Sequence, residues 1–328
     1  MTQIYIRYIN FWSGFYTKKT EVDRIIDSAI RYTFFKHSKT YTLVEDTSKT
    51  PNIVVSSVFG NPKSLSSFDE NTFIIVINGE NSYGHDHHYK WAYESLRNNG
   101  YRINLYLGFS REEDDVQKRF PLWLWYYDFY LKNESNAYRF IKDNSGTNFT
   151  TDDFEKRKLA ACMCARSNHF NWRSTFYNTC IQNGIIVKCP SKVCHNDKDI
   201  DSRGLSKAQY ISGFVFNICP ENTVTSGYCT EKLMECVMSG CIPIYWGDFD
   251  NEIIFNQNRI IKASSVIKDF PKLAQQVKYL LSNKDSLIEF FQQPLFTDNA
   301  IHVIDSFLDK LDSIPKMYDA FSRVSNKQ

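Results

Sequence analysis

A lysine stands at the start of a predicted helix, where the helix dipole disfavours positive charge. Thr230 is a suitable N-cap, and apolar residues follow at helical spacing from Leu233 to Val237. In the first turn Glu231 favours the dipole, whereas Lys232 opposes it by roughly 0.3–1 kcal/mol. That cost disappears if Lys232 faces an anion that also binds the free N–H groups of the helix start, as phosphates do. A solvated Lys232 is the other interpretation, and both stay open at this point.

More polar side chains lie just upstream. Residues 214–222, Phe-Val-Phe-Asn-Ile-Cys-Pro-Glu-Asn, are typical of a strand that runs into a polar turn. We expect Asn222 and Tyr228 to lie at the same sheet edge as the helix start, because α/β sheets bind ligands at the carboxyl ends of their strands. An amide and a carboxylate suit ribose or sugar hydroxyls, a tyrosine suits a ring face, and a lysine suits a phosphate.

Four further charged segments give weaker signals. They are 85–88 (His-Asp-His-His), 197–199 (Asp-Lys-Asp), 248–250 (Asp-Phe-Asp) and 111–115 (Arg-Glu-Glu-Asp-Asp). An Asp pair can hold Mg²⁺ or Mn²⁺ against donor phosphates, but neither pair follows an apolar strand in the first third of the chain. Four consecutive loop residues cannot easily close one tetrahedral metal site. We therefore predict no metal, and interpret 111–115 as the solvated start of a helix.

Strand-like runs alternate with helix-like runs along the chain. Strands are expected at 3–9, 52–58, 72–78, 101–109, 158–165, 185–189, 213–219 and 241–246, and helices at 21–35, 170–183, 205–211, 230–239, 265–282, 284–291 and 300–324. The continuous apolar character of several strands indicates a buried parallel sheet. A polar, linker-like stretch near 143–153 divides two such series. The pattern predicts an α/β fold with two facing Rossmann-like domains and a cleft between them.

Length and composition agree with two packed domains and exclude several classes of protein. The 328 residues are 42% hydrophobic, enough for two cores of roughly 150 residues each. A net charge of +2 argues against a nucleic-acid partner. No run reaches the ~20 apolar residues of a membrane span, so a cytoplasmic, soluble protein is expected. The nine cysteines, all between Cys162 and Cys241, are expected to be reduced and packed.

Several motifs of this chain form a familiar series. Residues 216–222 (Phe-Asn-Ile-Cys-Pro-Glu-Asn), 227–232 (Gly-Tyr-Cys-Thr-Glu-Lys) and 242–247 (Ile-Pro-Ile-Tyr-Trp-Gly) resemble the signature of the α1,3/4-fucosyltransferases of glycosyltransferase family 10. Residues 167–177 (Ser-Asn-His-Phe-Asn-Trp-Arg-Ser-Thr-Phe-Tyr) are similar to a helix of that family. Residues 78–81 (Asn-Gly-Glu-Asn) are similar to the Gly-Glu-Asn loop of its acceptor domain.

The resemblance implies a fold and a reaction. The fold is the GT-B type, with an acceptor-binding domain over 1–150, a donor-binding domain over 151–300, and a last helix in 301–328 that can pack back on the N-terminal domain. The reaction is inverting transfer of fucose from GDP-fucose to a hydroxyl of a GlcNAc-containing glycan in an α1,3-type linkage. Glu80 matches the catalytic base, which removes the proton of the acceptor hydroxyl.

The resemblance also implies five donor-binding residues, which are Arg173, Asn222, Tyr228, Glu231 and Lys232. The two cations would hold the donor diphosphate. The other three would hold the ribose or the sugar. Beyond the nucleotide-sugar donor and the glycan acceptor, no cofactor, metal, nucleic acid or membrane span is implied. A form without an anchor suggests a microbial or viral source.

One departure from the family pattern leaves alternatives open. The family has Phe where this chain has Pro220, and proline fixes φ and removes an N–H at the donor turn. The same chemistry with another nucleotide sugar is therefore the first alternative. A non-catalytic relative that binds a glycan or nucleotide is the second, and Glu80 discriminates between it and an enzyme. Without the resemblance, Glu80 is equally well explained as a solvated carboxylate in a strand-end turn.

Overall fold

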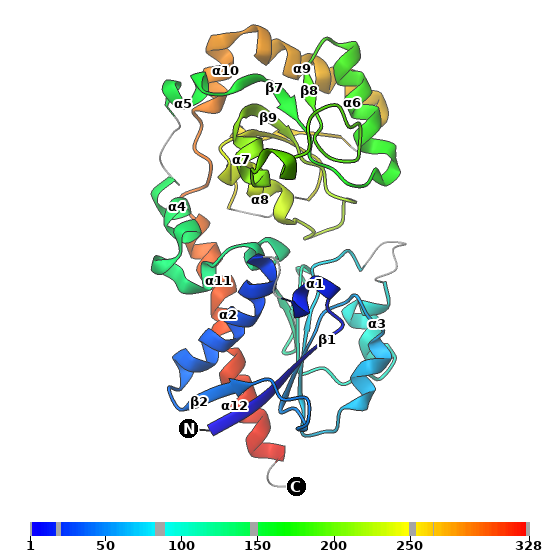
Figure 1. Ribbon diagram of the computed structural model, residues 1–328, viewed down its shortest axis with the longest axis vertical. Helices are drawn as coiled ribbons and strands as arrows, with labels where there is room; N and C mark the ends of the chain where they lie inside the picture. Colours follow the sequence, from blue (N-terminus) through cyan, green and yellow to red (C-terminus); the bar gives the residue numbers. More distant parts are fainter. Residues whose placement is uncertain are drawn as a thin grey trace. The chain divides into compact units, whose positions relative to one another are not determined.

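The computed structural model describes residues 2–17, 21–82, 89–144, 150–248, 254–264 and 266–325. The chain divides into two compact units (Figure 1). The first unit comprises Met1–Phe140, Thr225–Tyr228 and Ile301–Gln328, and the second comprises Ile141–Val224 and Cys229–Ala300.

In the described part of the first unit, six parallel strands form one sheet in the order β2-β1-β3-β4-β5-β6. The strands are β1 (Thr2–Ile9), β2 (Tyr41–Val44), β3 (Ile53–Ser56), β4 (Phe73–Ile77), β5 (Leu105–Gly108) and β6 (Gln117–Arg119). Every residue of β3, β4 and β5 is buried, as the continuous apolar runs predict.

Helices cover both faces of this sheet (Figure 1). The helices of this unit are α1 (Ser13–Tyr16), α2 (Glu21–His37), α3 (Tyr93–Asn98), α4 (Asn136–Asn144, which runs on into the second unit), α11 (Ala300–Asp312) and α12 (Ile314–Ser325). On one face, Ile74 of β4 clusters with Leu96 of α3. On the other, Phe73 of β4 packs against Phe321 of α12 with ring centroids 5.4 Å apart. The alternation along β4 therefore explains why both faces need a helix.

Two expectations about helices in this unit are wrong. Residues 111–115 do not begin a helix, because the Asp114 carboxylate accepts the backbone N–H groups of Val116 and Gln117 and turns the chain into β6. Residues 300–324 form two helices rather than one. Ser313 separates α11 from α12, since Pro315 fits the first turn of a helix and not its interior.

The second unit is a parallel sheet in the order β11-β10-β9-β7-β8. Its strands are β7 (Lys158–Cys162), β8 (Val187–Lys188), β9 (Phe214–Ile218), β10 (Ile242–Tyr245) and β11 (Ile261–Lys262). Its helices are α5 (Thr151–Glu155), α6 (Trp172–Gln182), α7 (Lys207–Ser212), α8 (Glu231–Met238), α9 (Phe270–Ser282) and α10 (Lys284–Phe291). Helix α6 packs on α9, and α7 packs on α8 (Figure 1). Two parallel-sheet α/β units confirm the predicted fold class.

A short segment of the donor motif belongs to the first unit. Gly227, at φ +81°, lies against that unit: an added Cβ would be 2.2 Å from the carbonyl oxygen of Phe109. The Gly227 carbonyl accepts a hydrogen bond from Arg119 Nη1 over 3.1 Å. Both the left-handed backbone and the close approach require glycine here.

Candidate functional site

Glu80 lies in the turn that follows β4, and its neighbour Asn78 shapes this turn. Asn78 is 2% exposed, and its Oδ1 accepts the Glu80 N–H over 3.0 Å. Its amide nitrogen donates to the hydroxyl of Tyr106 over 2.6 Å and to the hydroxyl of Ser82. With every polar atom of the Asn78 side chain engaged, the backbone under Glu80 has one well-defined conformation.

The half-buried Glu80 borders a pocket of about 340 Å³ within the first unit. The lining comes from the carboxyl ends of β1, β3 and β4, from α2 and from the 3-10 helix Leu122–Tyr126. Five of the lining residues are aromatic: Phe11, Trp12, Phe59, Trp125 and Tyr126. Glu80 is the one carboxylate among the lining residues that the structure describes. The position agrees with ligand binding at the carboxyl ends of parallel strands.

In the second unit, Arg173 holds the polar turn after β9. Arg173 is the second residue of α6 and is 4% exposed. Its Nη2 donates to the carbonyl oxygens of Pro220 and Glu221 over 3.0 and 3.3 Å, and to Asn222 Oδ1 over 3.1 Å. Its Nη1 donates to the carbonyl oxygen of Ser167 over 2.9 Å. A guanidinium with several carbonyl partners fixes the shape of the turn and keeps positive charge directly behind it.

Glu221 connects this turn to the start of α8, and the sequence alone did not single it out. Its side chain is 0% exposed. Its carboxylate accepts the Thr230 N–H over 2.8 Å, the Thr230 hydroxyl over 2.6 Å and the Tyr245 hydroxyl over 3.1 Å. Thr230 therefore does not cap α8 with its side chain, because its hydroxyl is directed to a stronger, charged acceptor. An acid inside a predicted strand-end turn was the available signal.

Lys232 is neither alone nor simply solvated. Its Nζ lies 3.2 Å from a carboxylate oxygen of Glu221 and 3.2 Å from one of Glu231, and it donates to the Thr230 hydroxyl over 2.8 Å. Its side chain is still 21% exposed. The two carboxylates offset the unfavourable position of a cation at the first turn of α8. From the sequence, either an anion ligand or a solvated side chain was expected for Lys232. The structure shows a different arrangement, in which Lys232 is paired with two carboxylates.

The charges around Glu231 set its ionisation. Burial would raise the pKa of Glu231, but the positive charges of Lys232 and Lys207 outweigh it and hold the pKa below its ordinary value. One turn further along α8, burial outweighs the Lys207 ion pair and raises the pKa of Glu235. Acidic and basic side chains therefore alternate around the start of α8, and each lies beside a side chain of opposite charge.

Four of the five predicted donor residues lie in the second unit, linked by Glu221. Arg173 contacts Asn222, and Lys232 contacts Glu231. Tyr228 instead belongs to the first unit, where it is 2% exposed and meets Phe109 edge-to-face at 5.1 Å. Its expected role beside the donor residues stays a prediction.

The weaker sequence signals can be followed only in part. Asp197 is engaged with Arg203 and with the hydroxyl of Tyr210. Residues 85–88 and Asp250 lie outside the described residues. Across the described ranges, no group of three or more His, Cys, Asp or Glu side chains has an arrangement that could hold a metal ion.

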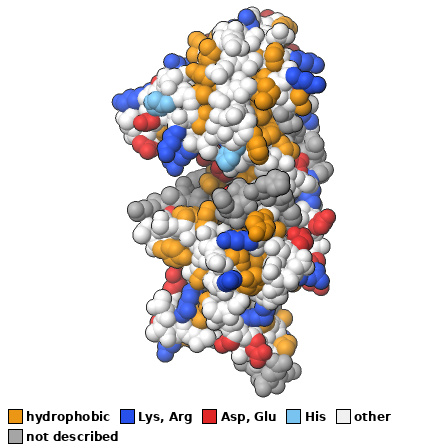
Figure 2. All heavy atoms as spheres, turned by 90° about the vertical axis from the view of Figure 1, so that its right-hand side faces the viewer, with side chains coloured by type: hydrophobic (Ala, Val, Ile, Leu, Met, Phe, Trp, Pro, Cys, Tyr) orange, Lys and Arg blue, Asp and Glu red, His pale blue; other side chains and the backbone are white. Residues whose placement is uncertain are grey.

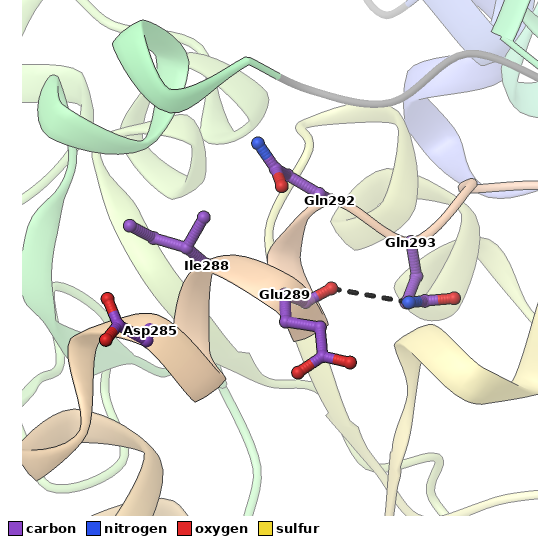
Figure 3. Close-up of a pocket in the computed structure, with 5 residues that line it drawn as sticks. All are labelled: Asp285, Ile288, Glu289, Gln292 and Gln293. Atoms are coloured by element: carbon purple, nitrogen blue, oxygen red, sulfur yellow. Dashed lines mark hydrogen bonds between the residues drawn. The ribbon is translucent and has the colours of Figure 1, made fainter.

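A second hollow of about 350 Å³ lies on α10 and contains none of the predicted site residues. Figure 3 shows its lining, which is Asp285, Ile288, Glu289, Gln292 and Gln293. The residues follow one another along a single helix and the turn after it, and Gln293 Nε2 donates to the carbonyl oxygen of Glu289. They form an ordinary polar surface. On the face drawn in Figure 2, acidic and basic side chains are likewise scattered.

Comparison with known proteins finds a family match within the second unit. Residues 154–298 match the model of glycosyltransferase family 10 (fucosyltransferase), C-terminal part. The chain is 33% identical over 93 residues to an alpha-(1,3)-fucosyltransferase of Helicobacter pylori, covering 28% of this chain and 19% of that protein. It is 27% identical over 172 residues to a putative fucosyltransferase of Acanthamoeba polyphaga mimivirus, covering 49% and 27%. The matches thus span between about a fifth and a quarter of these relatives.

Solved structures share the fold over nearly the whole chain. A crystal structure of an alpha1,3-fucosyltransferase superposes with a TM-score of 0.63 at 19% identity, covering 96% of this chain and 92% of that one. The same kind of enzyme with GDP-fucose gives a TM-score of 0.59 at 18% identity, covering 94% and 90%. These superpositions show that the chain shares the GT-B fold of those structures. The match of residues 154–298 to the family 10 model confirms the predicted resemblance.

One prediction concerned membranes. Within the described ranges, no helix is both long enough and apolar enough to cross a bilayer.

Proposed function

We propose that this protein transfers fucose from GDP-fucose to a hydroxyl of a GlcNAc-containing glycan, with inversion and in an α1,3-type linkage. The observation that carries the proposal is the family 10 match over the unit that holds Arg173, Asn222, Glu231 and Lys232. A structural neighbour of the same fold contains GDP-fucose, which supports this donor. On this proposal the first unit binds the acceptor and the second binds the donor.

Glu80 is the proposed general base. Its carboxylate takes the proton of the acceptor hydroxyl while the acceptor oxygen bonds to the anomeric carbon of fucose. The bond between that carbon and the diphosphate oxygen breaks in the same displacement, and GDP leaves with the electron pair. A single displacement inverts the anomeric centre, so one carboxylate is sufficient, whereas a retaining mechanism needs a second one as nucleophile. The pocket beside Glu80 supports this role because it offers space for an acceptor.

Positive charge for the leaving diphosphate comes from Arg173 and Lys232. Lys232 keeps an exposed fraction of 21% and stands at the amide end of α8, where phosphates commonly bind. In binding, the diphosphate would compete for Lys232 with Glu231 and Glu221, whose carboxylates hold the ammonium in place beforehand. Arg173 supports the turn through its hydrogen bonds and places a positive charge next to it. Asn222, Glu231 and Tyr228 are the proposed contacts of the ribose and the sugar.

The experiment is a transfer assay with GDP-fucose and N-acetyllactosamine, followed by NMR of the product and by thermal unfolding with GDP, UDP and their sugars. A ligand at 100 times its Kd stabilises the folded state by about 2.7 kcal/mol, which shifts the melting temperature measurably. We expect a shift with GDP and GDP-fucose and an α1,3-fucosylated product. The absence of a shift with every guanine nucleotide would contradict the fucose assignment.

Pro220 favours a second candidate, the same displacement with another nucleotide sugar. Pro220 is buried, and its carbonyl accepts from Arg173 in the donor turn. An aromatic side chain at this position would add a wall that proline lacks. The same thermal screen separates the two candidates, since a different nucleotide would give the largest shift.

A further inference from the structure

The Glu80 pocket contains a tryptophan whose position is fixed by a buried carboxylate. Trp12 follows β1 and lines the pocket. Its indole Nε1–H donates to Asp23 Oδ1 over 2.7 Å, and Asp23, in α2, is 0% exposed. The one polar atom of the Trp12 side chain is therefore bonded to the protein interior. The remainder of the ring is a hydrocarbon surface.

Three other aromatic rings restrain Trp12, and one of them is Phe11, with ring centroids 5.7 Å apart. Phe15 meets Trp12 edge-to-face at 5.8 Å and 79°, and Phe59 at 5.5 Å and 82°. Phe15 is 1% exposed, whereas Phe59 is 48% exposed. Rotation of the indole would break the Asp23 hydrogen bond and the three ring contacts. The pocket therefore presents a rigid aromatic surface before any ligand arrives, and such preorganisation lowers the entropic cost of binding.

The lining of the pocket defines the chemistry of its occupant. Among the lining residues that the structure describes there is no Lys or Arg, so a phosphate is a poor fit. Apart from its aromatic rings, the polar side chains among the lining residues are those of Ser57 and Glu80. A neutral ligand with one apolar face and hydroxyls at its edge fits this combination. A pyranose has such a face, formed by its C–H groups.

We propose that this pocket binds the acceptor sugar, with one face of a pyranose stacked on Trp12 and Asp23 acting as the positioning residue for that ring. The inference rests on the proposed function only in taking Glu80 as the base, which makes the pocket the acceptor side. Trp12 is then a binding residue and Asp23 acts through it.

The test measures binding of N-acetyllactosamine directly, by calorimetry and saturation-transfer NMR, to the full chain with GDP present. The variants are Trp12→Leu, which keeps apolar volume without a ring, Trp12→Phe, Asp23→Asn and the double variant of Trp12→Leu with Asp23→Asn. Phe35→Ala is the control, because Phe35 is a 49% exposed aromatic of α2 that does not line the pocket.

We expect Trp12→Leu to weaken sugar binding by about tenfold, and Trp12→Phe by less, with the affinity for GDP within about twofold of wild type. Asp23→Asn should raise the acceptor KM and leave the donor KM unchanged. Asp23→Asn should have no further effect on sugar binding in the Trp12→Leu background, because the indole that Asp23 orients is absent there. Phe35→Ala should bind as wild type does.

Equal sugar binding by wild type and a folded Trp12→Leu protein would overturn the proposal, as would the absence of sugar binding to wild type. If a variant fails to fold, the NMR map of the wild-type complex decides. Saturation of the ring C–H protons of one sugar face supports stacking, and saturation confined to another part of the sugar contradicts it. If GDP-fucose is not turned over while the sugar binds in a Trp12-dependent manner, the proposed function fails and the acceptor pocket stands.

Discussion

The two candidate regions hold their functional side chains in opposite ways. Glu80 is half-buried and borders a pocket lined mainly by apolar and aromatic residues, and Asn78 fixes its backbone. In the second unit, Glu221, Lys232 and their neighbours form an interlocked set of ion pairs and hydrogen bonds. Because Glu80 is half-buried whereas Glu221 is 0% exposed, a substitution of Glu80 should change chemistry with less effect on folding. A substitution in the second region should change folding and binding together.

The largest effect on stability is expected from Glu221→Ala. The change removes the buried carboxylate that accepts from the Thr230 N–H and the Tyr245 hydroxyl, and one of the two carboxylate partners of Lys232. Breaking a buried pair costs about 3–5 kcal/mol. Urea unfolding measures this loss in the free energy of unfolding. The control is Glu155→Ala, which removes an exposed pair with Lys284 and should cost no more than about 1 kcal/mol. Equal losses in the two variants would show that the second region is not interlocked.

A smaller loss is expected from Gly227→Ala. The left-handed φ of +81° strains any L side chain, and the new Cβ would stand 2.2 Å from the Phe109 carbonyl oxygen. We expect the free energy of unfolding to fall by about 1–3 kcal/mol. Gly100→Ala is a matched control, because its φ is +73° and nothing lies within 4 Å of an added Cβ. If both substitutions lower the free energy of unfolding by the same amount, the close contact at Gly227 contributes nothing to stability.

The smallest effect is a pH dependence carried by Glu231. Its folded-state pKa lies below the ordinary value of 4.5, so its contribution to stability is present above that pH and is lost as pH falls through the folded pKa. Urea titrations below pH 4.5 should show a steeper loss for wild type than for Glu231→Gln. Identical slopes would mean that Lys232 and Lys207 do not stabilise the ionised form.

The sequence predicted the parts of the fold that a single segment determines. Strands β3 and β4 followed from uninterrupted apolar runs, and α8 from helical spacing. Contacts between segments that are distant in sequence could not be predicted from the sequence. The role of Glu221 depends on Thr230 and Tyr245, which approach it only after β9 and β10 pair.

The site residues illustrate the same limit. The family motif led to Glu80 and Lys232, but a motif does not reveal that Lys232 is already paired with two carboxylates. Trp12 was not singled out, because its importance comes from Asp23, eleven residues away, and from the pocket. The assignment of 225–228 to the first unit likewise depends on Phe109 and Arg119, which are remote in sequence.

The central claim is that Glu80 is a chemically active carboxylate in a region that does not depend on it for folding. The most direct test compares wild type with Glu80→Gln for GDP release from GDP-fucose in the presence of N-acetyllactosamine, and for the free energy of unfolding. We predict that kcat falls by about 10²–10⁴-fold. The free energy of unfolding should stay within about 0.5 kcal/mol of wild type. Unchanged turnover by the Glu80→Gln protein would contradict the claim.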